Sequence, residues 1–67
     1  MSDQEILLDA LRFYEIDVVS VNGSRVRVQN DYEIEAQELG HYKLFDDGNI
    51  VALFNDLDEL CWFILNS

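Results

Sequence analysis

The dipeptide Asn22-Gly23 constrains the fold more than any other feature of the sequence. It lies between two runs rich in β-branched residues, 16–21 and 24–28. Asn-Gly between such runs is the strongest short-range signal for a β-hairpin, because a type I′ turn needs a positive φ at both central residues. The sequence therefore predicts two antiparallel strands joined by a two-residue loop. The expected pairs are residue 21 with 24, 19 with 26 and 17 with 28.

A third strand is predicted over residues 32–36, where polar and apolar side chains alternate. With a loop over 29–31, its apolar side chains join the valine face of the first hairpin. The same register brings opposite charges face to face, which contributes about 0.2–1 kcal/mol for each pair. The expected charge pairs are Arg27 with Glu33 and Arg25 with Glu35. A helix over 32–39 is the competing interpretation of this segment.

A second hairpin is predicted over residues 41–54. Its loop is expected at 46–48, with Gly48 in the left-handed position of a three-residue loop. The strand that follows, Ile50–Phe54, is apolar on both faces. We therefore expect this strand to be central in the sheet, or to be covered by a helix or a partner.

Two helices bracket the predicted strands. Ser2 and Glu5 match the Ser-x-x-Glu capping box before a helix over 3–14. A second helix begins near residue 56, with Asn55 or Asp56 as its N-cap. Helical periodicity predicts one buried stripe in each helix. The stripes are Ile6, Leu7, Ala10, Leu11, Phe13 and Tyr14 in the first helix, and Leu57, Leu60, Cys61, Ile64 and Leu65 in the second.

This order of elements predicts an α+β fold, in which a small antiparallel sheet of about five strands in two hairpins is flanked by N- and C-terminal helices. The 67 residues suffice for a single domain, 1–67. Chains this short often need a disulfide, a metal or self-association for stability. The single cysteine excludes an intramolecular disulfide, and the single histidine argues against a zinc site of Cys and His ligands.

Acidic side chains outnumber basic ones by 14 to 4, which gives a net charge of −10. Nucleic acids are bound mainly by Lys and Arg, so the charge excludes direct nucleic-acid binding and disfavours anionic membranes. No apolar run approaches the ~20 residues of a membrane span, and the acidic N-terminus does not resemble a signal peptide. We therefore expect a cytoplasmic protein that makes no contact with membranes.

No arrangement of residues predicts catalysis, so we expect a protein that is not an enzyme and binds no cofactor or metal. Cys61 lies on the inner stripe of a helix, which is typical of a buried thiol rather than a nucleophile. His41 has no paired nucleophile nearby in the sequence. Residues 46–49 lack the spacing of a calcium-binding EF-hand loop, and they suit a tight turn instead.

Six apolar side chains exceed what a core on one face of the sheet would use: Trp62, Phe63, Leu8, Val18, Val51 and Leu53. A helix on each face of the sheet would bury several of them. Otherwise they would form a surface for a protein partner or a second copy, where aromatic anchors dominate binding. The sequence predicts a non-catalytic module for protein–protein interaction or self-association, with Trp62 and Phe63 as its anchors.

An acidic mimic of nucleic acid, which would inhibit a basic nucleic-acid-binding protein, is the alternative hypothesis. Asp31, Glu33 and Glu35 form an acidic ladder along one predicted strand. Alternate residues of a strand are about 6.8 Å apart, whereas a duplex carries one charge per ~3.4 Å of each strand. A continuous acidic band on the folded surface would favour mimicry, and acids scattered beside an apolar patch would favour a protein partner.

Overall fold

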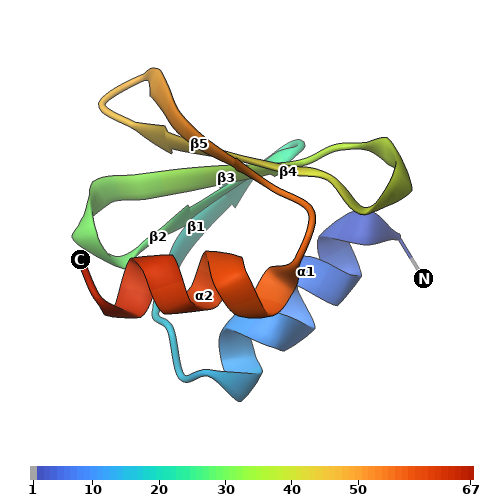
Figure 1. Cartoon of the computed structure of the whole chain (residues 1–67), viewed down its shortest axis with the longest axis horizontal. Coiled ribbons are helices and arrows are strands. Elements are labelled where there is room, and N and C mark those ends of the chain that lie inside the picture. Colours follow the sequence, from blue (N-terminus) through green and yellow to red (C-terminus); the bar gives the residue numbers. More distant parts are fainter. Residues whose placement is uncertain (1) are drawn as a thin grey trace.

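The computed structural model describes residues 2–67, which form two helices, five strands and two short 3₁₀ turns. The elements are α1 (Asp3–Phe13), β1 (Val18–Asn22), β2 (Arg25–Val28), η1 (Gln29–Asp31), β3 (Tyr32–Ala36), η2 (Glu38–Gly40), β4 (Tyr42–Asp46), β5 (Asn49–Phe54) and α2 (Leu57–Leu65). The strands make one antiparallel sheet in the order β1-β2-β3-β4-β5 (Figure 1). The predicted α+β fold, a small sheet with terminal helices, is confirmed.

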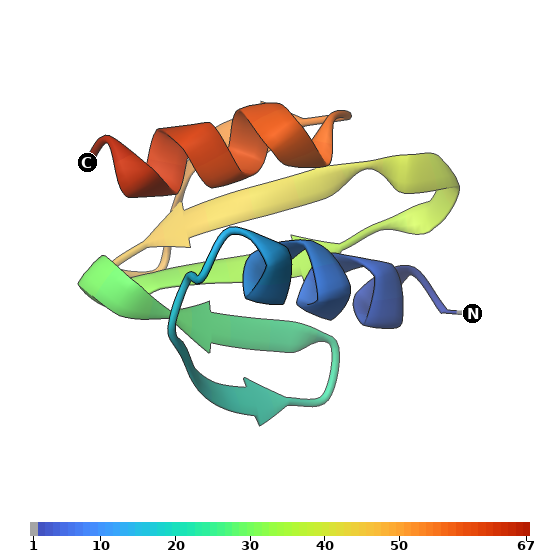
Figure 2. The ribbon, with the colours of Figure 1, turned by 90° about the horizontal axis from the view of Figure 1, so that it is seen from below.

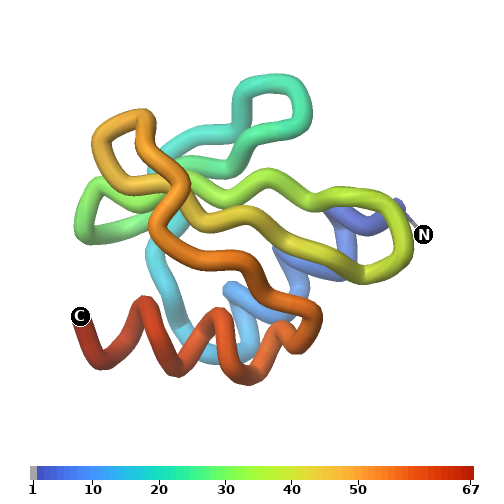
Figure 3. The backbone as a smooth tube through the Cα atoms, turned by 45° about the horizontal axis from the view of Figure 1, so that its top comes forward, coloured from blue at the N-terminus to red at the C-terminus, as the bar shows by residue number. Residues whose placement is uncertain are grey.

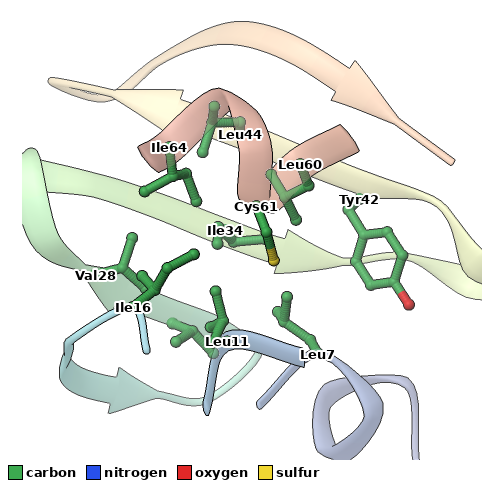
Figure 4. Close-up of a cluster of buried hydrophobic side chains, with 11 residues drawn as sticks. Leu7, Leu11, Ile16, Val28, Ile34, Tyr42, Leu44, Leu60, Cys61 and Ile64 are labelled. Atoms are coloured by element: carbon green, nitrogen blue, oxygen red, sulfur yellow. The ribbon is translucent and has the colours of Figure 1, made fainter. Parts of the chain in front are cut away.

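Both helices pack on the same face of the sheet (Figures 1 and 2). Their side chains meet those of the central strands in one core (Figure 4). The core consists of Leu7, Leu11, Ile16, Val26, Val28, Ile34, Tyr42, Leu44, Leu60, Cys61 and Ile64. The alternative of a helix on each face of the sheet is therefore contradicted for residues 2–67. The other face, called the open face below, carries charged side chains from β2, β3 and β4, whose burial under a helix would be costly.

The first hairpin turns one residue later than predicted. Asn22 still belongs to β1 and lies opposite Arg25, so the loop is Gly23-Ser24. Gly23 has a φ of 58°, whereas Ser24 is not among the residues with positive φ. A glycine at the first central position is the signature of a type II′ turn rather than the predicted type I′ turn.

This later turn changes the pairing of β1. Val21 lies opposite Val26, and a bulge at Val19 then brings Val18 opposite Val28. The predicted register of this hairpin is therefore wrong. β1 lies at the edge of the sheet and contributes no buried side chain, so the expected valine face is buried only on β2.

The register of β2 and β3 is confirmed, because Arg27 lies opposite Glu33 and Arg25 opposite Glu35. β3 covers the predicted residues, Tyr32–Ala36, so the competing interpretation of a helix over 32–39 is wrong. The loop predicted at 29–31 is the turn η1.

The second hairpin turns through Asp47 and Gly48, which have φ values of 53° and 80°. Asp46 pairs with Asn49, so the loop has two residues and the predicted three-residue loop is wrong. Positive φ at both central residues is the pattern of a type I′ turn. The tube in Figure 3 shows this hairpin and the bend by which the chain passes from β5 into α2.

β5 is an edge strand, so its predicted central position is wrong. Ala52 and Phe54 pack against the core beneath the helices and are half-buried. The remaining apolar side chains of β5, namely Ile50, Val51 and Leu53, are exposed. Only one of the two apolar faces of this strand is therefore covered within the described chain.

The predicted helix caps are confirmed. The Ser2 hydroxyl accepts a hydrogen bond of 3.2 Å from the Glu5 backbone N–H. An Asp56 carboxylate oxygen accepts one of 2.8 Å from the Asp58 N–H, so Asp56 is the N-cap of α2.

The predicted apolar stripes are too wide. Ile6, Phe13 and Leu65 are exposed, whereas Leu7 and Leu11 are fully buried. Ile6 precedes Leu7 by one residue and therefore lies roughly 100° around the helix from it. A single sheet face buries only the side chains that point almost directly at it.

Candidate protein-interaction surfaces

The structure separates the six apolar residues predicted to bind a partner. Trp62 and Phe63 lie on α2, Val51 and Leu53 on β5, Val18 on β1, and Leu8 on α1. Leu8 is half-buried and packs against the core. Val18 belongs to the opposite edge of the sheet from Val51 and Leu53. The six residues therefore do not form one continuous surface.

A contact between the two helices builds the first candidate surface. The Tyr14 hydroxyl, just after α1, donates a hydrogen bond of 2.6 Å to the Asp58 carboxylate in the first turn of α2. The Phe13 ring meets the Tyr14 ring edge-on, with 5.2 Å between centroids. Trp62 follows Asp58 by four residues and so lies on the same side of α2, one turn further on. We call Phe13, Tyr14, Asp58 and Trp62 the helix-layer patch.

The two large apolar side chains of this patch are the most exposed aromatic residues of the protein. Phe13 is 80% exposed and Trp62 is 63% exposed. Phe13 was predicted to be buried, so the sequence did not identify it as a candidate for binding. Its exposure follows from the position of α1 over β2 and β3, which leaves the outer side of that helix uncovered (Figure 2).

Phe63 has a structural role besides its partial exposure. Its ring packs against Tyr32 at a centroid distance of 6.0 Å and against Phe54 at 5.7 Å. The Tyr32 hydroxyl also donates a hydrogen bond of 3.0 Å to the hydroxyl of Ser67. These contacts hold the end of α2 on the sheet, so Phe63 contributes to folding and is a less specific probe of binding than Trp62.

The charges divide unevenly between the two sides of the sheet. Three of the four basic residues, Arg25, Arg27 and Lys43, lie on strands and point to the open face, since the residues between them point into the core. The fourth, Arg12, is paired with Asp9 on α1 at 3.4 Å. The helices and their caps carry six acids: Asp3, Glu5, Asp9, Asp56, Asp58 and Glu59. The helix layer is therefore strongly acidic around its exposed aromatic side chains.

On the open face, Arg25 forms the centre of a small cluster. Its guanidinium carbon lies 4.0 Å from the centroid of the Phe45 ring. Its nitrogens lie 3.4 Å from a Glu35 oxygen and 3.7 Å from a Glu33 oxygen. Phe45 is only 6% exposed although it is not part of the core beneath the helices, so Arg25 and its neighbours bury it.

This cluster also accounts for the acidic ladder along β3. Glu33 and Glu35 both contact Arg25, and Asp31 lies 3.7 Å from Arg27. Glu33 therefore pairs with Arg25, although Arg27 is the residue opposite it in the register. All three acids of the ladder are in contact with arginine.

A second candidate surface lies at the end of β5. A pocket of about 720 Å³ is lined by Gln37, Glu38, His41, Tyr42, Lys43, Leu53, Phe54 and Asn55. Leu53 is 70% exposed, and Leu39, in the neighbouring turn η2, is 90% exposed with a φ of 61°. The turn that contains this leucine is closed by a local hydrogen bond, in which the Gln37 N–H donates to the His41 carbonyl. Because a positive φ is uncommon for a leucine, the sequence contains no signal for this conformation.

The side chains with chemical reactivity are spread over the fold. Burial raises the pKa of the Cys61 thiol to about 11, with a smaller contribution from the Asp58 charge. The hydrogen bond to Asp58 raises the pKa of Tyr14 to about 12. His41 is exposed at the pocket beside β5, and within residues 2–67 no three side chains of His, Cys, Asp or Glu are grouped as metal ligands would be.

No family model, curated protein or solved structure matches this chain. Neither helix in the described part of the chain is long and apolar enough to cross a membrane.

Proposed function

We propose that this protein is a non-catalytic module that binds a basic protein partner through the helix-layer patch. One observation carries this proposal: an exposed tryptophan lies on a helix whose first turn is acidic, one turn from the hydrogen bond that joins the two helices. Tryptophan and tyrosine are the residues that most often dominate binding energy at protein interfaces. A cytoplasmic location belongs to the same proposal and is supported by the single, buried thiol.

The surrounding acids supply specificity and speed rather than most of the affinity. Acidic surface charges accelerate encounter with a basic partner and repel acidic ones, and salt weakens both effects. The same charges oppose self-association through this patch, because two copies would bring together net charges of −10 each. We therefore favour a basic partner over a second copy as the occupant of the helix-layer patch.

The acidic mimic of nucleic acid has weaker support. Its clearest candidate feature, the ladder of Asp31, Glu33 and Glu35, contacts the two arginines of β2. The acids of the helix layer lie beside exposed Phe13 and Trp62, and a partner that reads only negative charge would not need these aromatic rings. This arrangement corresponds to the one expected for a protein partner.

A pull-down from the native cell, followed by affinity measurement with the captured protein, tests this function. We expect Trp62→Ala to weaken binding by about thirtyfold, the equivalent of losing roughly 2 kcal/mol at an interface hot spot. Val19→Ala is the matched control, because Val19 is exposed to a similar degree on the edge strand β1 and belongs to neither candidate surface. Its affinity should equal that of the wild type.

Mimicry predicts a different pattern. Competition by DNA or RNA, loss of binding when Asp46 and Asp47 are both replaced by lysine, and no effect of Trp62→Ala would together support a mimic and contradict the helix-layer patch.

A further inference from the structure

The outer edge of β5 is free to pair with another strand. β5 is the last strand of the sheet, and within residues 2–67 only β4 pairs with it. An edge strand exposes a row of backbone N–H and C=O groups that can extend the sheet into another chain. Natural proteins usually protect such an edge with charged side chains or proline. β5, from Asn49 to Phe54, contains neither.

The side chains of β5 are also suited to a docked strand. Ile50 lies opposite Phe45, and Leu53 lies opposite Lys43, so both point to the open face, where no helix of the described chain covers them. A strand added beside β5 would place every second side chain over the same face and in contact with these residues. The strand edge and its exposed apolar side chains thus lie together.

The pocket beside β5 supplies a third feature. Leu53, Phe54 and Asn55 form one wall of this pocket of about 720 Å³. Peptides that add a strand to a sheet gain affinity from backbone hydrogen bonds and specificity from pockets that receive alternate side chains. Because its lining includes the last residues of β5, this pocket lies near one end of a docked strand.

We propose that β5 binds an extended segment of a partner protein as an additional strand, and that this segment is apolar at alternate positions and flanked by Lys or Arg. Acids stand close to both ends of β5: Asp46 and Asp47 before it, and Asp56 after it. Flanking basic residues complement the acids at both ends. This interaction goes beyond the function proposed above, since it uses the other side of the sheet and needs no residue of the helix-layer patch.

A second copy of the chain fits this edge poorly. If two β5 strands paired antiparallel about the point between Val51 and Ala52, Asn49 would lie opposite Phe54 of the other copy. Asp47 of each copy would then approach Asp56 of the other, at both ends of the pair. Like charges placed opposite each other on strands are destabilising, and the net charges of −10 add to the repulsion.

The test uses the full chain and a synthetic peptide with alternating valine and threonine between lysines at both ends. Binding is followed by NMR titration and by hydrogen exchange of backbone amides. We expect alternate amides of β5 to become protected from exchange, while those of β1 do not. A peptide methylated on alternate backbone nitrogens should bind about tenfold more weakly, because it loses the hydrogen bonds of the new ladder. A peptide with glutamates in place of lysines should also bind more weakly.

Variants separate this surface from the others. Leu53→Lys should weaken binding of the lysine peptide, because it introduces a positive charge at the new strand. Val21→Lys is the control, since Val21 is also exposed on an edge strand, and it should bind the peptide like the wild type. Trp62→Ala should also bind normally, so loss of the helix-layer function and loss of strand addition are distinguishable. Circular dichroism checks that each variant is folded.

Three results would overturn the assignment: protection of β1 or the helices instead of β5, equal affinity of the methylated peptide, or peptide-free dimers in which β5 is protected. The last result would identify a second copy as the occupant.

Discussion

Replacement of Arg25 by alanine tests the unusual burial of Phe45 on the open face. The guanidinium group covers the Phe45 ring at 4.0 Å and contacts both Glu33 and Glu35. The substitution removes all three contacts and exposes the ring to water. Because Arg25 is itself partly exposed, each electrostatic contact is weakened by solvent.

The expected loss in the free energy of unfolding follows from these contacts. A cation–π contact at an exposed site contributes about 0.5–1 kcal/mol. The two ion pairs contribute together about 0.5–1 kcal/mol, near the lower part of the range for cross-strand charges because of their exposure. We therefore expect Arg25→Ala to lower the free energy of unfolding by roughly 1–2 kcal/mol, a large share of the stability of a small domain.

Urea denaturation measures this change. With a slope near 1 kcal/mol per molar urea, typical of the smallest proteins, the midpoint should fall by about 1–2 M at an unchanged slope. Arg27→Ala is the control, because the ion pair of Arg27 is with the highly exposed Asp31 at 3.7 Å, and its loss should change stability by less than about 0.5 kcal/mol. A double-mutant cycle with Phe45→Leu isolates the contact between Arg25 and the ring.

Equal effects of Arg25→Ala and Arg27→Ala would refute this reasoning. So would a cycle in which the Arg25 and Phe45 substitutions are additive, because the arginine would then not cover the ring.

Three further predictions concern the core and the titrating groups. Leu44→Ala should lower the free energy of unfolding by about 2–5 kcal/mol, since Leu44 is fully buried, and loss of less than 1 kcal/mol in urea denaturation would contradict the core. The free energy of unfolding should decline between pH 10 and 12. The pKa of Tyr14 is its ordinary 10.0 in the unfolded chain and about 12 in the folded protein. The stabilisation by the Tyr14 hydroxyl is therefore complete below pH 10 and is lost as the pH rises through 12. Tyr14→Phe should make the alkaline decline shallower, and an identical pH profile would disprove the role of the hydrogen bond. Cys61 should resist thiol reagents at pH 8 until urea unfolds the protein, because burial raises its pKa to about 11, and rapid labelling of the folded protein would contradict its burial.

Several features of the fold could be predicted because they depend on residues close together in the chain. The caps at Ser2 and Asp56 are local hydrogen bonds between a side chain and the next turn of backbone. The register of β2 and β3 could also be predicted, because a short loop leaves few alternatives and only one of them matches both the apolar face and the charges. The turn at Gly23 lies one residue later than predicted, since glycine suits both the second central position of a type I′ turn and the first of a type II′ turn.

The exposure of the apolar side chains could be predicted less well, because it depends on where the helices pack. Trp62 was identified correctly as lying away from the core, but Phe13 was not, and Leu8 proved to be half-buried. The exposure of Phe13 and of Leu8 depends on contacts between segments that are distant in the sequence. The left-handed Leu39 lies instead in a short turn closed by a local hydrogen bond.

The sequence by itself determined the order of helices and strands, the helix caps, the pairing of the two arginines of β2 with β3, and the strongly negative charge. Local hydrogen bonds, turn preferences and the alternation of side chains are sufficient for these features. Only the tertiary structure decided that both helices cover one face, that β5 is an edge, and that Arg25 buries Phe45. These depend on which apolar surfaces pack against each other, and in a chain of 67 residues one helix layer leaves the other face of the sheet open.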